Sequence, residues 1–285
     1  MEIITRERVR SLLKERNPKS DKFAFGSLLV IAGSEGYTGA PYFTAKAASL
    51  TGAGLIRLIV PETIWAVEAI KNNEVMVSAV EDDEDGRISS KATEKILDFA
   101  KKSSAVLIGP GCGINKGIQS ILKSLLTVLR VPLLIDADGL NVLSEDINIL
   151  KYAASDVILT PHKKEFARLY GEKIIPNNKT LQNFAYEHNV TVVYKEAETR
   201  IATNDNRLII NRGHQNSGMA KGGSGDVLSG IIGGFLAQGY NASDAAIIGV
   251  YLHSLAGKEA RDSKGERSML PTDTLENIPF VLKEM

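Results

Sequence analysis

Short apolar runs alternate with helix-like patterns from residue 27 to residue 194 of this chain. Runs rich in Val, Ile and Leu predict strands at residues 27–32, 55–60, 75–80, 105–108, 132–136, 156–159 and 190–194. Apolar residues at helical spacing predict helices at 41–51, 63–71, 89–101, 118–129 and 163–170. Fully apolar strands that alternate with helices are typical of an α/β fold, in which helices cover both faces of a mostly parallel central sheet.

The pattern changes after Tyr194. Residues 200–203 and 207–210 flank Asn204-Asp205-Asn206 and predict a hairpin, which would give the sheet a mixed edge. Helices are expected again at 224–238 and 243–261. Because no polar segment is long enough to act as a linker, one domain over residues 1–285 is expected.

Composition excludes several classes of function. The chain has 34 Lys and Arg against 34 Asp and Glu, and this balance argues against nucleic acid or an anionic membrane as a partner. The single Cys112 excludes an internal disulfide and a multi-cysteine metal site. We find no secretory leader and no apolar run of about 18 residues. We therefore expect a cytoplasmic protein that acts on small molecules.

A glycine turn precedes the helix expected near residue 224, within NSGMAKGGSGDVLSG at residues 216–230. Glycines at 222, 223 and 225 permit positive φ, and free N–H groups at a helix start favour an anion such as phosphate. Asp226 would repel that anion at close range. It is therefore either a helix-start residue that pairs with the dipole, or a group that acts on a substrate proton beside the phosphate.

Other polar turns follow the predicted strands, where ligands collect in open parallel sheets. GSEGYTGAP at 33–41 is glycine-rich but matches neither the dinucleotide fingerprint nor the Walker phosphate loop, and an ordinary connection is equally expected. GPGCG at 109–113 is either a tight turn or room for a ligand. In LLIDADGLN, Asp136 and Asp138 would share one face of a continuing strand. They can hold Mg²⁺ through water, or Asp138 caps the next helix.

The predicted strand at 156–159 leads into ILTPHKKEFARL. Thr160 is expected to cap the next helix and Pro161 to begin it, with His162 in the first turn and Glu165 one turn later. His162 is either structural or positions a substrate hydroxyl or water.

Lys195 follows the predicted strand at 190–194. It either belongs to the group of polar turns, or it is a solvated lysine near Glu196 and Glu198. The polar turns agree with one another. An anion-binding turn beside a proton acceptor, without a protein nucleophile, indicates phosphoryl transfer to a hydroxyl.

These segments together resemble the stand-alone ADP-dependent NAD(P)H-hydrate dehydratases of the ribokinase-like superfamily. The resemblance extends from Ser27 to Arg261 and is carried by NSGMAKGGSGDVLSGIIGG, LLIDADGLN, LTPHKKEFARL and GPGCG in the family's order, with no companion epimerase domain before them. It implies a carbon–oxygen lyase that restores NADH or NADPH from the S form of the hydrated cofactor. The hydroxyl is phosphorylated by ADP or ATP, and phosphate then leaves.

The resemblance also implies site residues. Asp226 accepts the hydroxyl proton, and the amides of Gly223, Ser224 and Gly225 stabilise the transferred group. Contacts to the hydrated dinucleotide are implied at Ala40, Gly113, His162 and Asp226, contacts to the adenine nucleotide at Lys195, Glu196, Ala197, Glu198, Thr199 and Gly225, and supporting roles at Asp138, Asn141 and Glu165. Mg²⁺ would bridge the phosphates, with ligands left unassigned. The resemblance also implies a homo-oligomer, namely a tetramer.

Some residues depart from the family pattern. KEAET at residues 195–199 replaces a glycine-rich KGAGT-like segment and places Glu196 and Glu198 beside the nucleotide. Lys164 replaces a glycine and Ser224 a threonine. The alternatives are a ribokinase-like kinase for a small alcohol of the hydroxyethylthiazole or pyridoxal type, and a nucleotide-binding protein without catalysis.

Overall fold

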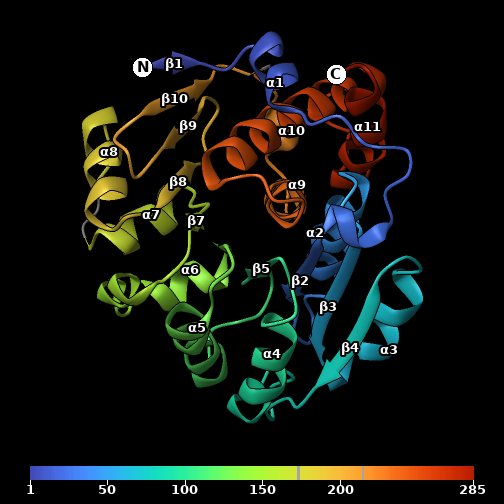
Figure 1. The fold of residues 1–285 in the computed structure, drawn as a ribbon, viewed down its shortest axis with the longest axis vertical. Helices are drawn as coiled ribbons and strands as arrows, with labels where there is room; N and C mark the ends of the chain where they lie inside the picture. The colour runs from blue at the N-terminus through green and yellow to red at the C-terminus, as the bar shows by residue number, and fades with distance from the viewer. Residues whose placement is uncertain (172–173, 214) are drawn as a thin grey trace.

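The computed structural model describes residues 1–171, 174–213 and 215–285. A ten-stranded sheet runs through this part of the chain in the order β1-β10-β9-β8-β7-β6-β5-β2-β3-β4 (Figure 1). Its strands are β1 (Glu2–Ile3), β2 (Ser27–Ile31), β3 (Leu55–Pro61), β4 (Met76–Val80), β5 (Ala105–Ile108), β6 (Leu133–Ile135), β7 (Val157–Leu159), β8 (Thr191–Tyr194), β9 (Thr199–Ala202) and β10 (Leu208–Asn211).

The sheet is parallel except at β9, which pairs antiparallel with both β8 and β10. The expected mostly parallel sheet with a mixed edge is therefore confirmed. At that edge β1 adds to β10 in parallel, with Glu2 opposite Ile209. A strand of two residues carries no apolar period, which is why the sequence did not predict it.

Helices cover both faces of the sheet (Figure 1). The face that receives Leu28 and Val30 packs against α2, α9, α10 and α11, whereas Leu29 and Ile31 face α4, α5 and α7. Successive strand residues point to opposite faces, so a strand covered on both sides is apolar throughout. The helices are α1 (Arg6–Leu12), α2 (Gly39–Leu50), α3 (Glu62–Lys71), α4 (Thr93–Ala100), α5 (Lys116–Val128), α6 (Asp138–Leu143), α7 (Lys163–Tyr170), α8 (Asn178–Glu187), α9 (Ser224–Ala237), α10 (Ala242–Lys264) and α11 (Pro271–Lys283).

Short 3₁₀ segments join these elements. They are η1 (Lys22–Phe25), η2 (Ser90–Ala92), η3 (Ile147–Tyr152) and η4 (Ser217–Met219). The helix predicted over 89–101 is wrong in one respect, because η2 precedes α4. The Ser89 hydroxyl accepts from the Lys91 amide and holds that tighter turn. Among the described residues, no helix is both long and apolar enough to span a membrane.

Glycines set the position of α9. A Cβ at Gly230 would lie 2.3 Å from the Thr44 carbonyl oxygen of α2, and one at Gly234 would lie 2.1 Å from Thr51 Oγ1. A Cβ at Gly233 would come within 3.0 Å of Leu107 on the sheet. Without side chains at these positions, α9 packs closely against both α2 and β5. Its first turn is thereby fixed at the carboxyl edge of the strands.

Candidate active site

The polar turns predicted from the sequence meet at the carboxyl edge of the sheet. The Gly33 amide donates to the Pro110 carbonyl (2.8 Å), which joins the turns after β2 and β5. The Asp136 amide donates to the Ile108 carbonyl (3.1 Å), and the Lys195 amide to the Pro161 carbonyl (2.9 Å). Backbone bonds therefore continue from turn to turn beyond the strand ends. They bring residues far apart in the sequence into one site.

The glycine turn leads into α9 as predicted, but positive φ occurs at Gly223 (φ 102°) and not at Gly222 or Gly225. A Cβ at Gly223 would lie 2.8 Å from the Phe43 ring, while one at Gly222 would meet nothing within 4 Å. The first intrahelical bond runs from the Val227 amide to the Gly223 carbonyl (3.1 Å). The amides of Gly225 and Asp226 precede it and are placed for an anion.

The turn is fixed from behind. The Ser224 amide donates to the Lys221 carbonyl (3.2 Å), so it is already engaged within the turn. Lys221 Nζ donates to the carbonyls of Arg267 (2.9 Å) and Met269, in the connection from α10 to α11. The turn therefore holds its shape through the protein and does not need a ligand to form it.

Asp226 lies half-buried in the first turn of α9. Its pKa is raised to about 7, first by burial and then by the negative charges of Asp136, Asp138 and Glu165, which together outweigh the opposing effect of Lys195. A carboxyl group with a pKa this close to neutral pH is well suited to accept a proton and release it again. Dipole pairing alone explains neither the burial nor the surrounding carboxylates.

Lys195 is not the solvated lysine of the alternative interpretation. Its side chain is 19% exposed, and Nζ lies 2.7 Å from Asp136 Oδ1 and 3.8 Å from Glu165 Oε2. Burial alone would lower the pKa of Lys195, but the two carboxylates outweigh burial and raise the pKa. The same Nζ would be 3.5 Å from a Cβ at Gly225. Lys195 is therefore a fixed cation next to the first turn of α9.

The segment after β6 differs from both sequence interpretations. Strand β6 ends at Ile135, and Ala137 adopts φ 48°, so Asp136 and Asp138 do not continue a strand. Asp138 does not cap α6 either, since its Oδ2 accepts from the Gly113 amide (2.8 Å) and its Oδ1 from Asn141 Nδ2 (3.2 Å). Asp138 thus ties the GPGCG turn to α6.

Asp136 is buried, and both of its oxygens are occupied. Lys195 donates to Oδ1, and the hydroxyl of Ser229 in α9 donates to Oδ2. Each of the four carboxylate oxygens of Asp136 and Asp138 therefore accepts one hydrogen bond from the protein. Among the described residues, no group of three His, Cys, Asp or Glu side chains is arranged to hold a metal ion.

Helix α7 covers the predicted residues 163–170, but its N-cap lies two residues after the expected Thr160. Its N-cap is His162, whose Nδ1 accepts from the Glu165 amide (3.1 Å), while Glu165 Oε2 accepts from the His162 amide (2.8 Å). Thr160 is therefore not the cap, and Pro161 is not in the helix. This reciprocal cap leaves 48% of the His162 side chain exposed, free to meet a ligand with the rest of its ring.

Two predicted substrate contacts lie on loops that pack together. A Cβ at Gly111 would lie 2.9 Å from the Ala40 side chain, so the GPGCG turn rests on the start of α2. The Ser34 hydroxyl donates to the Gly111 carbonyl (2.8 Å) and joins the two loops. Gly113 (φ 70°) ends that turn. Ala40 and Gly113 therefore line the same part of the sheet edge.

Residues 195–198 form the tight connection between β8 and β9, and Thr199 is the first residue of β9. Glu196, Ala197 and Glu198 are exposed, and the Glu196 carboxylate pairs with Arg200 at 2.7 Å. One of the two added negative charges is thus countered within the protein. The other, on Glu198, faces solvent.

The sequence interpretation did not identify the roles of Ser229 and His253. The imidazole of His253 in α10 interacts with the Ser224 backbone, and burial lowers its pKa to about 4. It is therefore neutral at neutral pH, and its Nε2 has no hydrogen-bond partner in the described part of the chain. Ser229 lies three positions after Asp226 and so about one helical turn away, but its hydrogen-bond partner Asp136 lies 93 positions away along the chain.

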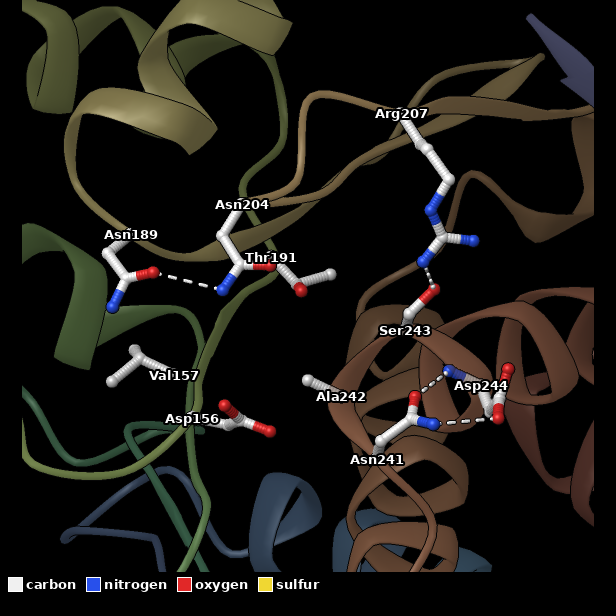
Figure 2. Close-up of a pocket in the computed structure, with 10 residues that line it drawn as sticks. All are labelled: Asp156, Val157, Asn189, Thr191, Asn204, Arg207, Asn241, Ala242, Ser243 and Asp244. Carbon is white, nitrogen blue, oxygen red and sulfur yellow. Dashed lines mark hydrogen bonds between the residues drawn. The ribbon is translucent and has the colours of Figure 1, made fainter.

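The opposite sheet edge carries a cavity of about 200 Å³ at the starts of β7, β8 and α10 (Figure 2). Its polar groups bond to one another. Arg207 donates to Ser243 (3.2 Å), Asn204 to Asn189 (2.9 Å) and Asn241 to Asp244 (2.8 Å). These internal pairs leave little unmet hydrogen bonding for a ligand, and none of the predicted site residues lies there.

The parallel sheet, the anion-binding helix start and the half-buried carboxylate define a ribokinase-like enzyme. The family model described as NAD(P)H-hydrate dehydratase matches residues 28–280, and the chain belongs to this family. It is 32% identical over 257 residues to an ADP-dependent (S)-NAD(P)H-hydrate dehydratase of Lactiplantibacillus plantarum, covering 89% of this chain and 87% of the relative.

A bifunctional NAD(P)H-hydrate repair enzyme of Moorella thermoacetica is 36% identical over 287 residues, covering 99% of this chain but 54% of that protein. The chain thus spans about half the length of such bifunctional relatives. Among solved structures, the ADP/ATP-dependent NAD(P)H-hydrate dehydratase of Bacillus subtilis, co-crystallised with ATP/Mg²⁺, superposes with a TM-score of 0.85 at 27% identity, covering 99% and 98% of the two chains.

Proposed function

We propose that this chain, as one domain over residues 1–285, repairs the S form of hydrated NADH or NADPH at the expense of ADP or ATP. The supporting observation is the position of Asp226, half-buried with a pKa of about 7 beside an anion-binding glycine turn. A carboxylate there accepts a proton from a hydroxyl whose oxygen attacks the terminal phosphorus bound at the turn.

The proposed reaction has two steps. The substrate hydroxyl oxygen bonds to the terminal phosphorus, the bond to the bridging oxygen breaks, and Asp226 takes the hydroxyl proton. AMP leaves when ADP is the donor. The carbon–oxygen bond then breaks, inorganic phosphate leaves with the electron pair, and loss of a ring proton restores the double bond. Gly225 and its neighbouring amides offset the charge on the transferred group.

The two ligands occupy different parts of the sheet edge in this proposal. Ala40, Gly113 and His162 contact the hydrated dinucleotide. In support, Ala40 packs against the turn that ends at Gly113, and about half of the His162 side chain is exposed. The exposed turn at residues 195–199 contacts the adenine nucleotide. Asp138, Asn141 and Glu165 support these loops, as their hydrogen bonds to Gly113, Asp138 and His162 indicate.

Mg²⁺ enters the proposal only as part of the nucleotide substrate. Asp136 and Asp138 accept hydrogen bonds from the protein, and in the described part of the chain no three His, Cys, Asp or Glu side chains are arranged as a metal cage. Mg²⁺ commonly binds substrate phosphates and keeps several waters. When bound, it would supply charge neutralisation for the phosphates, and we assign no step of the reaction to it. A homotetramer and a cytoplasmic location stay predictions.

The test supplies purified protein with hydrated NADH or NADPH and with ADP or ATP in turn. We expect near-ultraviolet absorbance of the reduced cofactor to return together with inorganic phosphate. A stable phosphoester without reduced cofactor would support the alcohol kinase, which the family match makes the weaker alternative. Nucleotide binding without turnover of any pair would support a non-catalytic protein.

A further inference from the structure

A buried network of charges lies beneath the proposed proton acceptor. Asp136 Oδ1 accepts from Lys195 Nζ at 2.7 Å, and Glu165 Oε2 lies 3.8 Å from the same nitrogen. The side chains of Asp136 and Glu165 are 1% and 8% exposed. Two buried carboxylates on one ammonium keep it in place and charged, since an unpaired charge at this depth is costly.

The network is attached to α9 as well as to the sheet. The Ser229 hydroxyl donates to Asp136 Oδ2 and lies 3.1 Å from the Gly225 carbonyl oxygen, one turn from Asp226. Lys195 Nζ reaches the same turn from the other side, because a Cβ at Gly225 would be 3.5 Å from it. Asp226 therefore has a fixed positive charge and a fixed negative charge close to it.

We propose that Lys195 and Asp136 form an electrostatic pair that positions and tunes the proton acceptor Asp226, with Lys195 favouring its carboxylate form and Asp136 opposing it. The inference rests on the proposed function and deepens it, because Asp136 and Ser229 gain a role beyond folding. Lys195 then acts as a buried partner of Asp226 in addition to any contact with the nucleotide.

Other groups also surround Asp226. Asp138 on α6 and Glu165 on α7 add negative charge, and the neutral, buried His253 on α10 lies near Ser224 and Lys195. Glu165 responds to both replacements, because Lys195 lowers its pKa and Asp136 raises it. Since Glu165 affects the pKa of Asp226 less than either Asp136 or Lys195 does, the direct effect of each replacement sets the direction of the shift.

The two replacements should act in opposite directions. Lys195→Met removes a positive charge, so the Asp226 carboxylate becomes harder to form and its titration moves to higher pH. Asp136→Asn removes a negative charge but keeps Oδ1 as an acceptor for Lys195, and Glu165 still pairs with that lysine. The Asp226 titration then moves to lower pH. An opposite or like charge this close commonly shifts a carboxyl pKa by about one unit or more.

Two measurements test the pair on the full chain. The first is the acidic limb of kcat/KM, which falls as Asp226 becomes protonated. The second is the carboxyl ¹³C titration of Asp226 without ligands, assigned by loss of its signal in Asp226→Asn. We expect the midpoint pH of both curves to be higher in Lys195→Met and lower in Asp136→Asn than in wild type. Asp156→Asn, an exposed aspartate at the opposite sheet edge, is the matched control and should shift neither.

The double variant Lys195→Met with Asp136→Asn keeps the test usable if a single replacement fails to fold, because it removes both members of the 2.7 Å pair and leaves Glu165 with the His162 amide as its donor. Its Asp226 titration should fall between those of the single variants. Shifts in the same direction for both single variants, or no shift in any variant, would overturn the proposal. Opposite titration shifts in a protein that turns over no hydrated cofactor would keep the pair and reject the proposed function.

Discussion

Asp138 Oδ2 accepts a hydrogen bond from the Gly113 amide at 2.8 Å, so a residue at the start of α6 fixes the end of the turn that follows β5. A hydrogen bond from a backbone amide to a carboxylate is stronger than one to a neutral acceptor. Since Gly113 is a proposed contact of the hydrated dinucleotide, this bond sets the shape of the substrate site before any ligand binds.

Asp138→Ala should therefore weaken substrate binding more than turnover. Loss of a hydrogen bond to a charged group costs about 1.5–3 kcal/mol, which corresponds to a KM about tenfold or more higher. Asp138→Asn, whose one remaining side-chain oxygen can take the place of Oδ2 and accept from the Gly113 amide, should have a smaller effect. Both Asp138 variants are assayed at a pH well above the acidic limb of kcat/KM, because Asp138 also raises the pKa of Asp226. An unchanged KM in Asp138→Ala would show that the Gly113 turn is fixed without it.

The sequence predicted the strands well and the contacts between residues at their ends poorly. Residues 105–108 are a local run of apolar residues, so β5 matches its prediction to the residue. The Lys195–Asp136 pair joins positions 59 apart, and no local pattern links them. The positive φ of Ala137, which turns Asp136 inward, occurs at a residue type that rarely adopts it.

The helices missed by the sequence have weaker signals. Helix α11 contains Pro279, a residue that normally ends or kinks a helix, and α8 begins within Pro-Asn-Asn at residues 176–178, a composition typical of a loop. Thr160 is a residue type that commonly caps helices, but here it is buried and its hydroxyl donates to the Ile135 carbonyl (3.4 Å), so it does not cap α7.

Asp226→Asn should lose activity and gain stability. Removing a general base costs about 10²- to 10⁴-fold in rate. The folded pKa, about 7, lies above the ordinary 3.8, so the native state retains a proton that the unfolded chain has lost and stability falls as pH rises between these values. The slope is about 1.4 kcal/mol per pH unit. Urea unfolding should find the variant more stable than wild type above pH 7 and equal to it below 3.8; a variant that kept full turnover would reject Asp226 as the base.

Gly223→Ala should destabilise the glycine turn, whereas Gly222→Ala should not. Gly223 has φ 102° and a Cβ there would lie 2.8 Å from Phe43, while a Cβ at Gly222 meets nothing within 4 Å. Backbone strain of this kind costs about 1–3 kcal/mol. Thermal unfolding without ligand compares the two variants. Equal melting temperatures would mean that the turn relaxes around the new side chain.

Glu198→Gln should strengthen nucleotide binding, and Glu196→Gln should not. The Glu198 charge faces solvent, whereas Glu196 pairs with Arg200 at 2.7 Å and helps to hold the turn. An exposed charge interaction is worth about 0.2–1 kcal/mol, so the Kd for ADP should fall by up to about fivefold, and less at high salt. Calorimetric titration at two ionic strengths measures both effects. A gain of equal size in both variants would show that Arg200 does not counter Glu196.

His253→Gln should change the acid stability in the direction opposite to Asp226→Asn. Burial lowers the pKa of His253 from 6.5 to about 4, so as pH falls through this range the unfolded chain binds a proton that the native state refuses, and stability is lost. The expected loss is about 1.4 kcal/mol per pH unit. The variant should lack it, so its stability relative to wild type should rise from pH 6.5 to pH 4 in urea unfolding. In Asp226→Asn the relative stability should fall over the same range, because wild type keeps its proton on Asp226 there. A parallel response of the two variants would contradict the neutral, buried state of His253 that supports the Ser224 backbone.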